Sequence, residues 1–290
     1  MSVYSISNSK LSISVNTLGA ELISLKSNTT ELLWQADKLV WPRYAPVLFP
    51  IVGKLKENKF NYEDSDYNLS QHGFARDKEF ALTVQNESVL EFELTANEET
   101  LEIFPFHFSL RIRYELSEAV LSVKYLVFNP DKTDLLFSIG AHPGFNCKRV
   151  AEETLNDFYL EFDGKKELVV EKLQDGLLSG EKSVLKLDSG KLQLSKSTFD
   201  NDALVFKNTQ IEDVKLCSLK SKTKINFRCK GWPYLGIWTK KGSDAFVCLE
   251  PWFGITDSVN FQGSFSSKEG IIGLKPNCKF EASFSIEISE

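Results

Sequence analysis

The sequence has no apolar run that approaches the ~20 residues a helix needs to cross a bilayer. Its first ten residues lack a basic segment followed by an apolar core, so they do not resemble a secretory signal. Lysine and arginine form no block and the net charge is −6, so no sustained positive field is available to bind nucleic acid or anionic lipid. We therefore expect a soluble, cytoplasmic protein with no nucleic-acid or membrane partner. The sequence leaves the oligomeric state open.

Cysteine is scarce and shows no functional spacing. The five cysteines are odd in number, widely spread and without a C-x-x-C pair: Cys147, Cys217, Cys229, Cys248 and Cys278. This distribution argues against a disulfide framework or a zinc site and fits a reducing compartment. Cys248 lies beside a motif described below, and we interpret it as a small buried apolar residue in a strand.

The chain also lacks an internal repeat and a low-complexity linker, so it offers no domain boundary. Its 290 residues are 42% hydrophobic and 12% aromatic, which is enough to bury a large core. All-β chains of this length commonly form one domain. We expect residues 1–290 to be a single domain.

Apolar and polar residues alternate with a period of two along the whole chain, for example at 11–15, 90–94 and 280–288. The longest alternating run, 106–116, places its apolar residues on one face and its polar residues on the other. His107 falls on the polar face among arginines, so we expect it to be solvated and to have no catalytic role. The pattern is typical of a strand-rich protein.

Turn-forming residues, such as those at 129–131 and 163–164, divide these runs into short strands. A period of 3.6 is rare, and the best short helix candidate covers 148–156. The sequence therefore predicts an all-β fold, a large antiparallel β-sandwich with few short helices.

An apolar, strand-like stretch from Phe137 to Asn146 presents His142 at a backbone break made by Pro143 and Gly144. Pro143 favours extended backbone at the residue before it, so the imidazole is carried on a stiff segment. Imidazole can give or take a proton near neutrality, which makes His142 the first candidate for chemistry. Taken alone, the stretch fits better with a histidine that is only hydrogen-bonded at a strand end.

Three further stretches place polar side chains beside a proline or glycine: 45–54 with Lys54 after Gly53, 71–77 with His72, Arg76 and Asp77 around Gly73, and 248–257 with Glu250 before Pro251. We expect the third stretch to be a strand that ends at Glu250, because Pro251 cannot donate to the ladder. A carboxylate opposite the imidazole of His142 would supply a paired base and acid. Glu250 is equally consistent with an ion pair to Arg76 or Lys54.

Six motifs occur in order along the chain: V-L-F-P-I-V-G-K-L, H-G-F-A-R-D-x-E-F, F-P-F-x-F-x-L-x-x-x-Y, G-A-H-P-G-F-N, P-Y-L-G-I-W-T and C-L-E-P-W-F-G-I-T-D. This set resembles the aldose 1-epimerase (galactose mutarotase-like) superfamily, in a divergent, bacterial-type branch. The resemblance extends over nearly the whole chain, from about Gly19 to Ile272. It implies a galactose mutarotase-like supersandwich with a sugar cleft on one concave face, and no metal or organic cofactor.

The resemblance also implies roles for individual residues. His142 would protonate the pyranose ring oxygen, and Glu250 would remove the proton from the C1 hydroxyl. His72 resembles the second active-site histidine, which binds sugar hydroxyls, and Asp202, or the nearby Asp200, resembles the substrate-binding aspartate. We expect Glu250 and His142 to face each other across one pocket, separated by about the width of a pyranose ring.

Aromatic side chains near the motifs could stack on a sugar ring, although such residues are more often simply core: Trp34, Trp41, Phe145, Trp252 and Phe253.

Two departures from the family pattern leave the substrate open. Lys54 stands where many members have arginine, which keeps the charge but loses the bidentate fork. The H-G-F-A-R version of the second motif is similar to divergent branches that include hexose-6-phosphate epimerases. Arg76 would then meet a phosphate, or it would pair with Asp77 or Glu79 in a structural role. The first interpretation is a mutarotase acting on a free aldohexose, and the alternatives are a hexose-6-phosphate 1-epimerase and a sugar-binding β-sandwich without turnover.

Overall fold

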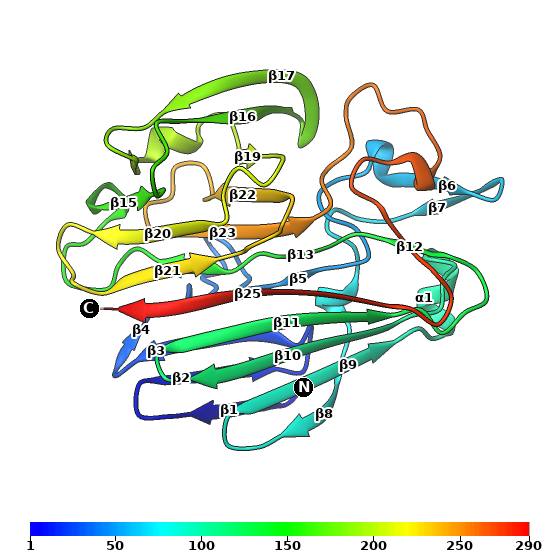
Figure 1. The fold of residues 1–290 in the computed structure, drawn as a ribbon, viewed down its shortest axis with the longest axis horizontal. Helices are drawn as coiled ribbons and strands as arrows, with labels where there is room; N and C mark the ends of the chain where they lie inside the picture. Colours follow the sequence, from blue (N-terminus) through cyan, green and yellow to red (C-terminus); the bar gives the residue numbers. More distant parts are fainter. Residues whose placement is uncertain (290) are drawn as a thin grey trace.

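The computed structural model describes residues 1–289 and confirms the predicted antiparallel β-sandwich (Figure 1). One layer is a nine-stranded sheet in the order β18 (Lys191–Gln193), β15 (Phe158–Glu161), β20 (Asp213–Ser218), β21 (Lys224–Arg228), β25 (Lys279–Ser289), β11 (Val120–Phe128), β10 (Ser109–Ser117), β9 (Val89–Thr95) and β8 (Ala81–Gln85). The red C-terminal strand β25 therefore lies inside this sheet, between β21 and β11 (Figure 1).

The second layer is an eight-stranded sheet. Its order is β17 (Leu177–Lys186), β16 (Glu167–Gln174), β19 (Leu204–Phe206), β22 (Tyr234–Trp238), β23 (Phe246–Phe253), β13 (Ile139–Ala141) and β5 (Val47–Leu48), with β14 (Gly144–Asn146) also paired to β23. The two layers meet through aromatic side chains. Phe145 packs on Phe227 with ring centroids 6.1 Å apart, and Phe253 packs on Phe280 at 5.1 Å.

Smaller elements complete the chain. A four-stranded sheet contains β1 (Val3–Ser7), β2 (Leu11–Asn16), β3 (Glu21–Ser27) and β4 (Thr30–Glu31). Two two-stranded sheets pair β12 (Leu135–Phe137) with the distant β24 (Ile272–Leu274), and β6 (Lys59–Tyr62) with β7 (Ser65–Asn68). The helices are α1 (Glu98–Ile103) and the 3₁₀ turns η1 (Lys56–Asn58), η2 (Ala75–Asp77), η3 (Leu155–Asp157), η4 (Lys196–Phe199) and η5 (Phe265–Ser267). Within residues 1–289, no helix combines the length and apolar character needed to cross a membrane.

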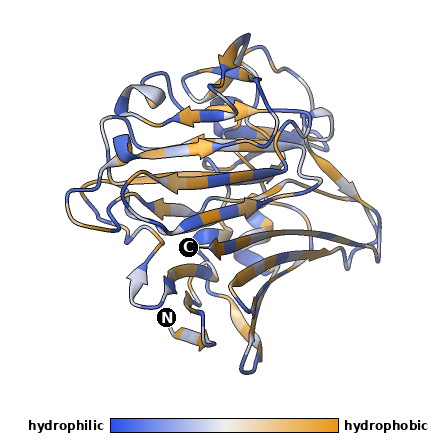
Figure 2. Ribbon diagram, turned by 60° about the vertical axis from the view of Figure 1, so that its left-hand side comes forward, coloured by the Kyte–Doolittle hydropathy of each residue, from blue (hydrophilic) through white to orange (hydrophobic). Residues whose placement is uncertain are grey.

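Apolar and polar residues alternate along the strands, as the orange and blue bands in Figure 2 show, and this alternation matches that of buried and more exposed positions. From 106 to 116 every apolar residue of the predicted face is buried, and His107 is exposed as expected. Antiparallel strands with one face on the core bury every second residue, so the period of two follows directly from the sandwich.

The predicted helix over 148–156 is wrong, since only its last two residues belong to a helix, η3. The carboxylate of Glu153 accepts hydrogen bonds from the backbone N–H groups of Arg149 at 2.7 Å and Val150 at 3.2 Å. A side chain that bonds nearby backbone donors in this way competes with the helical hydrogen-bond pattern. The segment forms an irregular turn for that reason.

Candidate active site

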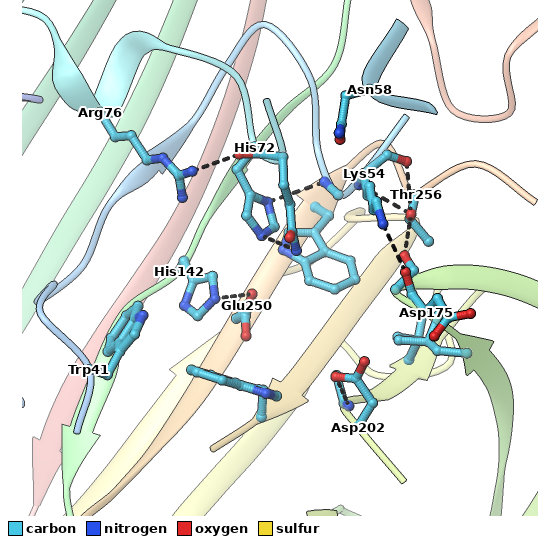
Figure 3. A pocket seen from close by; sticks show the side chains of 18 residues that line it. Trp41, Lys54, Asn58, His72, Arg76, His142, Asp175, Asp202, Glu250 and Thr256 are labelled. Carbon is cyan, nitrogen blue, oxygen red and sulfur yellow. Dashed lines mark hydrogen bonds and ion pairs between the residues drawn. The ribbon is translucent and has the colours of Figure 1, made fainter. Parts of the chain in front are cut away.

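A cavity of about 540 Å³ lies on the face of the eight-stranded sheet that is turned away from the sandwich core (Figure 3). Along β23, Leu249 points into the core, whereas Glu250 and Trp252 line the cavity. The segments 53–58, 71–76 and 173–176 supply further lining residues. The cavity thus brings together all three polar stretches singled out in the sequence.

His142 and Glu250 are direct neighbours in this cavity. The β13–β23 and β14–β23 ladders share one antiparallel register, and this register places His142 opposite Glu250 in the gap between β13 and β14. Opposed residues on one face of an antiparallel pair lie close enough for their side chains to interact. His142 Nε2 lies 3.1 Å from Glu250 Oε2. The two groups do share one pocket, but the expected separation of a pyranose width is wrong.

Strand β23 does not end at Glu250, which corrects the sequence prediction. It continues through Pro251 to Phe253 and pairs with β22 along this length. The backbone N–H of Leu249 donates to the carbonyl of Pro143. The backbone nitrogen of residue 251, two positions later in the strand, faces the same side, toward the gap between β13 and β14. Because the missing N–H of Pro251 falls at this gap, the ladder to β22 is unaffected.

Burial controls the protonation of the pair. Only 8% of His142 and 2% of Glu250 is exposed, and the imidazole stacks on Trp41 with centroids 4.8 Å apart and meets the edge of Trp238 at 5.6 Å. Burial lowers the pKa of His142 to about 3, and burial, with the charge of Asp202, raises the pKa of Glu250 well above its usual range. Both shifts favour the neutral form of the group concerned, the imidazole of His142 and the carboxyl group of Glu250.

His72 lies beside this pair, with its ring centroid 5.7 Å from that of His142. Its Nδ1 accepts a hydrogen bond from the Gly53 N–H at 3.2 Å. Desolvation and the neighbouring His142 lower the pKa of His72 well below its usual value, so the ring is neutral. With Nδ1 as acceptor, a neutral ring carries its proton on Nε2, which lies 3.2 Å from the side-chain amide of Gln71.

Lys54 and Arg76 both line the cavity, on opposite sides of His72 (Figure 3). Lys54 Nζ donates to the carbonyl of Asp175 at 3.2 Å, and the Arg76 guanidinium donates to the carbonyl of Gln71 at 2.6 Å. Arg76 also lies 3.8 Å from the carboxylate of Asp77, whereas the partner of Glu250 is His142. The ion pair between Glu250 and either cation, which the sequence left open, is therefore not formed.

Asp202 lines the cavity and Asp200 does not belong to its lining. Asp202 adopts a positive φ of 78°, and its carboxylate accepts the N–H of Ala203 at 2.7 Å. The carbonyl of Asp200 instead accepts a hydrogen bond from Lys241. Of the two aspartates considered, Asp202 is therefore the candidate for contact with a ligand.

The indole of Trp252 forms part of the cavity wall because the neighbouring strands carry glycine. A Cβ at Gly140 on β13 would lie 2.7 Å from this ring, and a Cβ at Gly236 on β22 would lie 2.4 Å from it. Neither glycine has a positive φ, so each serves close approach and not backbone freedom. The two missing side chains let the indole lie against the sheet.

A buried polar network fixes the loop that carries Lys54. The hydroxyl of Thr256 accepts the N–H of Lys54 at 3.1 Å, and Asp257 accepts the N–H of Lys56 at 2.8 Å. Asp257 is paired in turn with the buried amino group of Lys268 at 3.0 Å. These bonds connect the 53–58 loop to the end of β23 and hold the cavity rim in place.

The aromatic predictions divide in two. Trp41 and Trp252 line the cavity, whereas Trp34, Phe145 and Phe253 do not and pack within the protein. Sequence reasoning did not single out several other lining residues, among them Asn58, Asp175, Trp238 and Thr256. Trp238 and Thr256 lie within the quoted motifs, but Asn58 and Asp175 carried no signal.

Several known proteins resemble this chain in sequence and fold. The profile of the family described as aldose 1-epimerase matches residues 2–287. The chain is 31% identical to the chromosomal protein LacX of Lactococcus lactis subsp. lactis over 98% of both chains. It is 34% identical to the structure of a galactose mutarotase related enzyme from Lactobacillus acidophilus, with a TM-score of 0.95 over 100% of this chain and 98% of that one. A galactose mutarotase-like protein from Lactobacillus casei is 28% identical, with a TM-score of 0.91 over 99% of this chain and 100% of that one.

Proposed function

Because this chain belongs to the aldose 1-epimerase family, we propose that it is a mutarotase that interconverts the α and β anomers of an aldohexose. The observation that carries the proposal is the buried contact between His142 and Glu250 at the wall of a cavity. Anomer exchange requires one group to remove a proton from the C1 hydroxyl and another to protonate the ring oxygen. The two oxygens are bonded to the same carbon, so an acid and a base in contact can reach both.

In the proposed reaction, Glu250 removes the proton of the C1 hydroxyl and His142 delivers a proton to the ring oxygen. The bond between C1 and the ring oxygen breaks, and the open aldehyde rotates about C1–C2. Reclosure on the other face, with the proton transfers reversed, gives the other anomer. Such positioned proton-transfer groups contribute typically ~10²–10⁴-fold each, and this scheme uses no cofactor.

In the proposed scheme the pair holds one proton, on the carboxyl group of Glu250, and this proton supplies the acid. Its transfer from the carboxyl of Glu250 to Nε2 of His142 produces an imidazolium and a carboxylate without any exchange with solvent. The low exposure of both groups limits competition by water for this proton. The raised pKa of Glu250 also makes it a stronger base than an ordinary carboxylate when it acts on the sugar.

Two other residues would hold the sugar. The Nε2–H of His72 can donate to a sugar oxygen next to His142, and the carboxylate of Asp202 can accept from sugar hydroxyls. The indole face of Trp252 suits the apolar face of a pyranose. The proposal places this reaction in the cytoplasm, in keeping with five free thiols.

A hexose-6-phosphate is the second candidate substrate, and a specific observation favours it. Arg76 lines the cavity, and its ion pair with Asp77 is long, at 3.8 Å, which leaves the guanidinium able to bind a phosphate oxygen. Lys54, across His72, is a further cation on the rim. A sugar-binding protein without turnover has less support, because binding alone needs no buried acid and base in contact.

The test is the rate of anomer exchange, followed by polarimetry or NMR, with glucose, galactose and their 6-phosphates as freshly dissolved single anomers. We expect acceleration over the uncatalysed rate for at least one of these sugars. The sugar with the largest kcat/KM identifies the substrate class. If sugars bind but anomer exchange is accelerated for none of them, only the sugar-binding protein without turnover remains.

A further inference from the structure

Cys248 lies close to both His142 and Glu250, the proposed acid and base. It is two residues before Glu250 on β23, so its side chain is on the same face of the strand, and it is fully buried. The imidazole nitrogen of His142, the sulfur of Cys248 and a carboxylate oxygen of Glu250 all lie within 4.8 Å of one another. The proposed chemistry uses only two of these three groups.

The three groups form a donor set of one nitrogen, one sulfur and one oxygen. Zinc binds these donors at ~2.0–2.3 Å in tetrahedral geometry, which places two nitrogen or oxygen ligands ~3.4 Å apart. The 3.1 Å between His142 Nε2 and Glu250 Oε2 is close to this value, so a small movement of the sulfur would complete the set. Three protein ligands with one open position are typical of zinc sites that accept an exogenous ligand.

We propose that His142, Cys248 and Glu250 form an inhibitory binding site for a soft divalent metal ion such as Zn²⁺, with its open position toward the cavity. The thiol proton and the proton shared by the pair pass to solvent when the metal binds, because each ligand binds in its deprotonated form. A bound ion occupies both proton-transfer groups, so sugar turnover stops. This inhibitory effect rests on the proposed function, whereas the metal site itself does not.

The spacing of the cysteines in the sequence does not predict this site, which is formed only by the fold. His142 reaches the other two ligands only because β13 and β14 pair with β23 in one register. The thiolate selects Zn²⁺, Co²⁺ or Cd²⁺ over Mg²⁺, which prefers oxygen ligands in octahedral geometry.

Metal binding is tested by titrating the full-length protein with Co²⁺ and recording the thiolate-to-metal charge-transfer absorption, followed by displacement with Zn²⁺. The exposed Cys278 is first replaced by serine to remove a competing thiol. We expect one Co²⁺ per chain and at least ~100-fold weaker Zn²⁺ binding in Cys248→Ala. Cys229→Ala, which removes a buried thiol near Ile211, is the matched control and should bind as the parent does. Mg²⁺ should have no effect.

A parent protein without the thiolate band at millimolar Co²⁺, or a Cys248→Ala variant with unchanged affinity, overturns the metal site. Cys248→Ser, checked for an unchanged thermal transition, replaces the alanine variant if that variant does not fold. Zn²⁺ should abolish anomer exchange in the parent and the Cys229→Ala control, and spare the Cys248 variant at the same concentration. A protein that binds Co²⁺ through Cys248 but never accelerates exchange refutes the proposed function and leaves the metal site intact.

Discussion

The imidazole of His142 and the carboxylate of Glu250 lie 3.1 Å apart because two interrupted strands and one continuous strand share a single antiparallel register. The gap between β13 and β14 frees His142 from the ladder, and Pro251 on β23 tolerates that gap because it has no N–H to satisfy. The backbone therefore brings together an imidazole and a carboxyl group, and burial favours the neutral form of each.

The first prediction separates binding from turnover. Glu250→Gln keeps the shape of the side chain but removes the basic site, and His142→Asn removes the group that delivers a proton. Each variant should bind sugar while catalysed exchange falls by at least ~10²-fold. Because each group serves the step that the other enables, the double variant should be little slower than either single variant. The exchange rate above background and the sugar affinity are measured for all four proteins.

The matched controls for this experiment are His107→Asn and Glu87→Gln, two exposed positions outside the cavity that should leave the rate unchanged. Full activity of Glu250→Gln would remove Glu250 from the mechanism. A loss of binding as large as the loss of rate would make Glu250 a sugar-holding residue.

The second prediction is that Glu250→Gln stabilises the fold at neutral pH. The pKa of Glu250 is raised in the folded protein, so its contribution to stability is fully present below the unfolded value of about 4.5 and is lost as pH rises toward the folded value. The neutral amide avoids this loss. We expect a gain of about 1 kcal/mol, or roughly 2–4 °C in Tm, at pH 7 and a smaller gain near pH 4.5. Thermal melts of both proteins across this pH range provide the check, and an equal or lower Tm at pH 7 contradicts it.

The third prediction concerns acid destabilisation through His142. Its pKa of about 3 in the folded protein is below the unfolded value of 6.5, so the unfolded state binds more protons between these values. The stability contributed by the neutral imidazole is therefore complete above pH 6.5 and is lost as pH falls toward 3. The free energy of unfolding should decline more steeply in the wild type than in His142→Asn, by at most about 1.4 kcal/mol per pH unit. Urea unfolding at several pH values measures this difference, and parallel curves for the two proteins would refute it.

The fourth prediction distinguishes the two candidate substrates. If the natural substrate carries a phosphate, Lys54→Glu and Arg76→Glu should lower kcat/KM for the phosphorylated sugar much more than for the neutral one, by at least ~10-fold. The attraction that these changes remove exists only for the phosphate. Lys132→Glu, an exposed charge reversal outside the cavity, is the control. Equal losses of kcat/KM on both sugars would mean that Lys54 and Arg76 have a structural role at the cavity rim.

The fifth prediction tests the wall formed by Trp252. The Cβ of Gly236→Ala would lie 2.4 Å from the indole, so the ring must move into the cavity or away from the sheet. We expect sugar affinity or kcat/KM to fall at least ~10-fold, since small misplacements of binding groups have large effects on rate. Gly273→Ala, whose Cβ would meet only an ordinary contact at 3.7 Å, should behave as the wild type. An unchanged Gly236→Ala protein would show that Trp252 does not shape the site.

The sequence by itself determined the strand-rich architecture and marked several residues that line the cavity. The alternation over 106–116 follows from burial of one strand face, and that local pattern needs no knowledge of the partner strands. The prolines and glycines beside His142, His72 and Glu250 marked these residues, and the structure brings all three to one cavity.

Only the tertiary structure decided how these residues meet. The contact of His142 with Glu250, the continuation of β23 through Pro251 and the position of Cys248 all depend on strand register between distant segments. Asn58 and Asp175 join the cavity through loops that have no pattern of their own, and Glu153 folds a segment with helical appearance into a turn through side-chain bonds. The period of two in the sequence shows which face of a strand is buried. The pairing between strands, and the pKa shifts that burial causes, arise only when the sheets assemble.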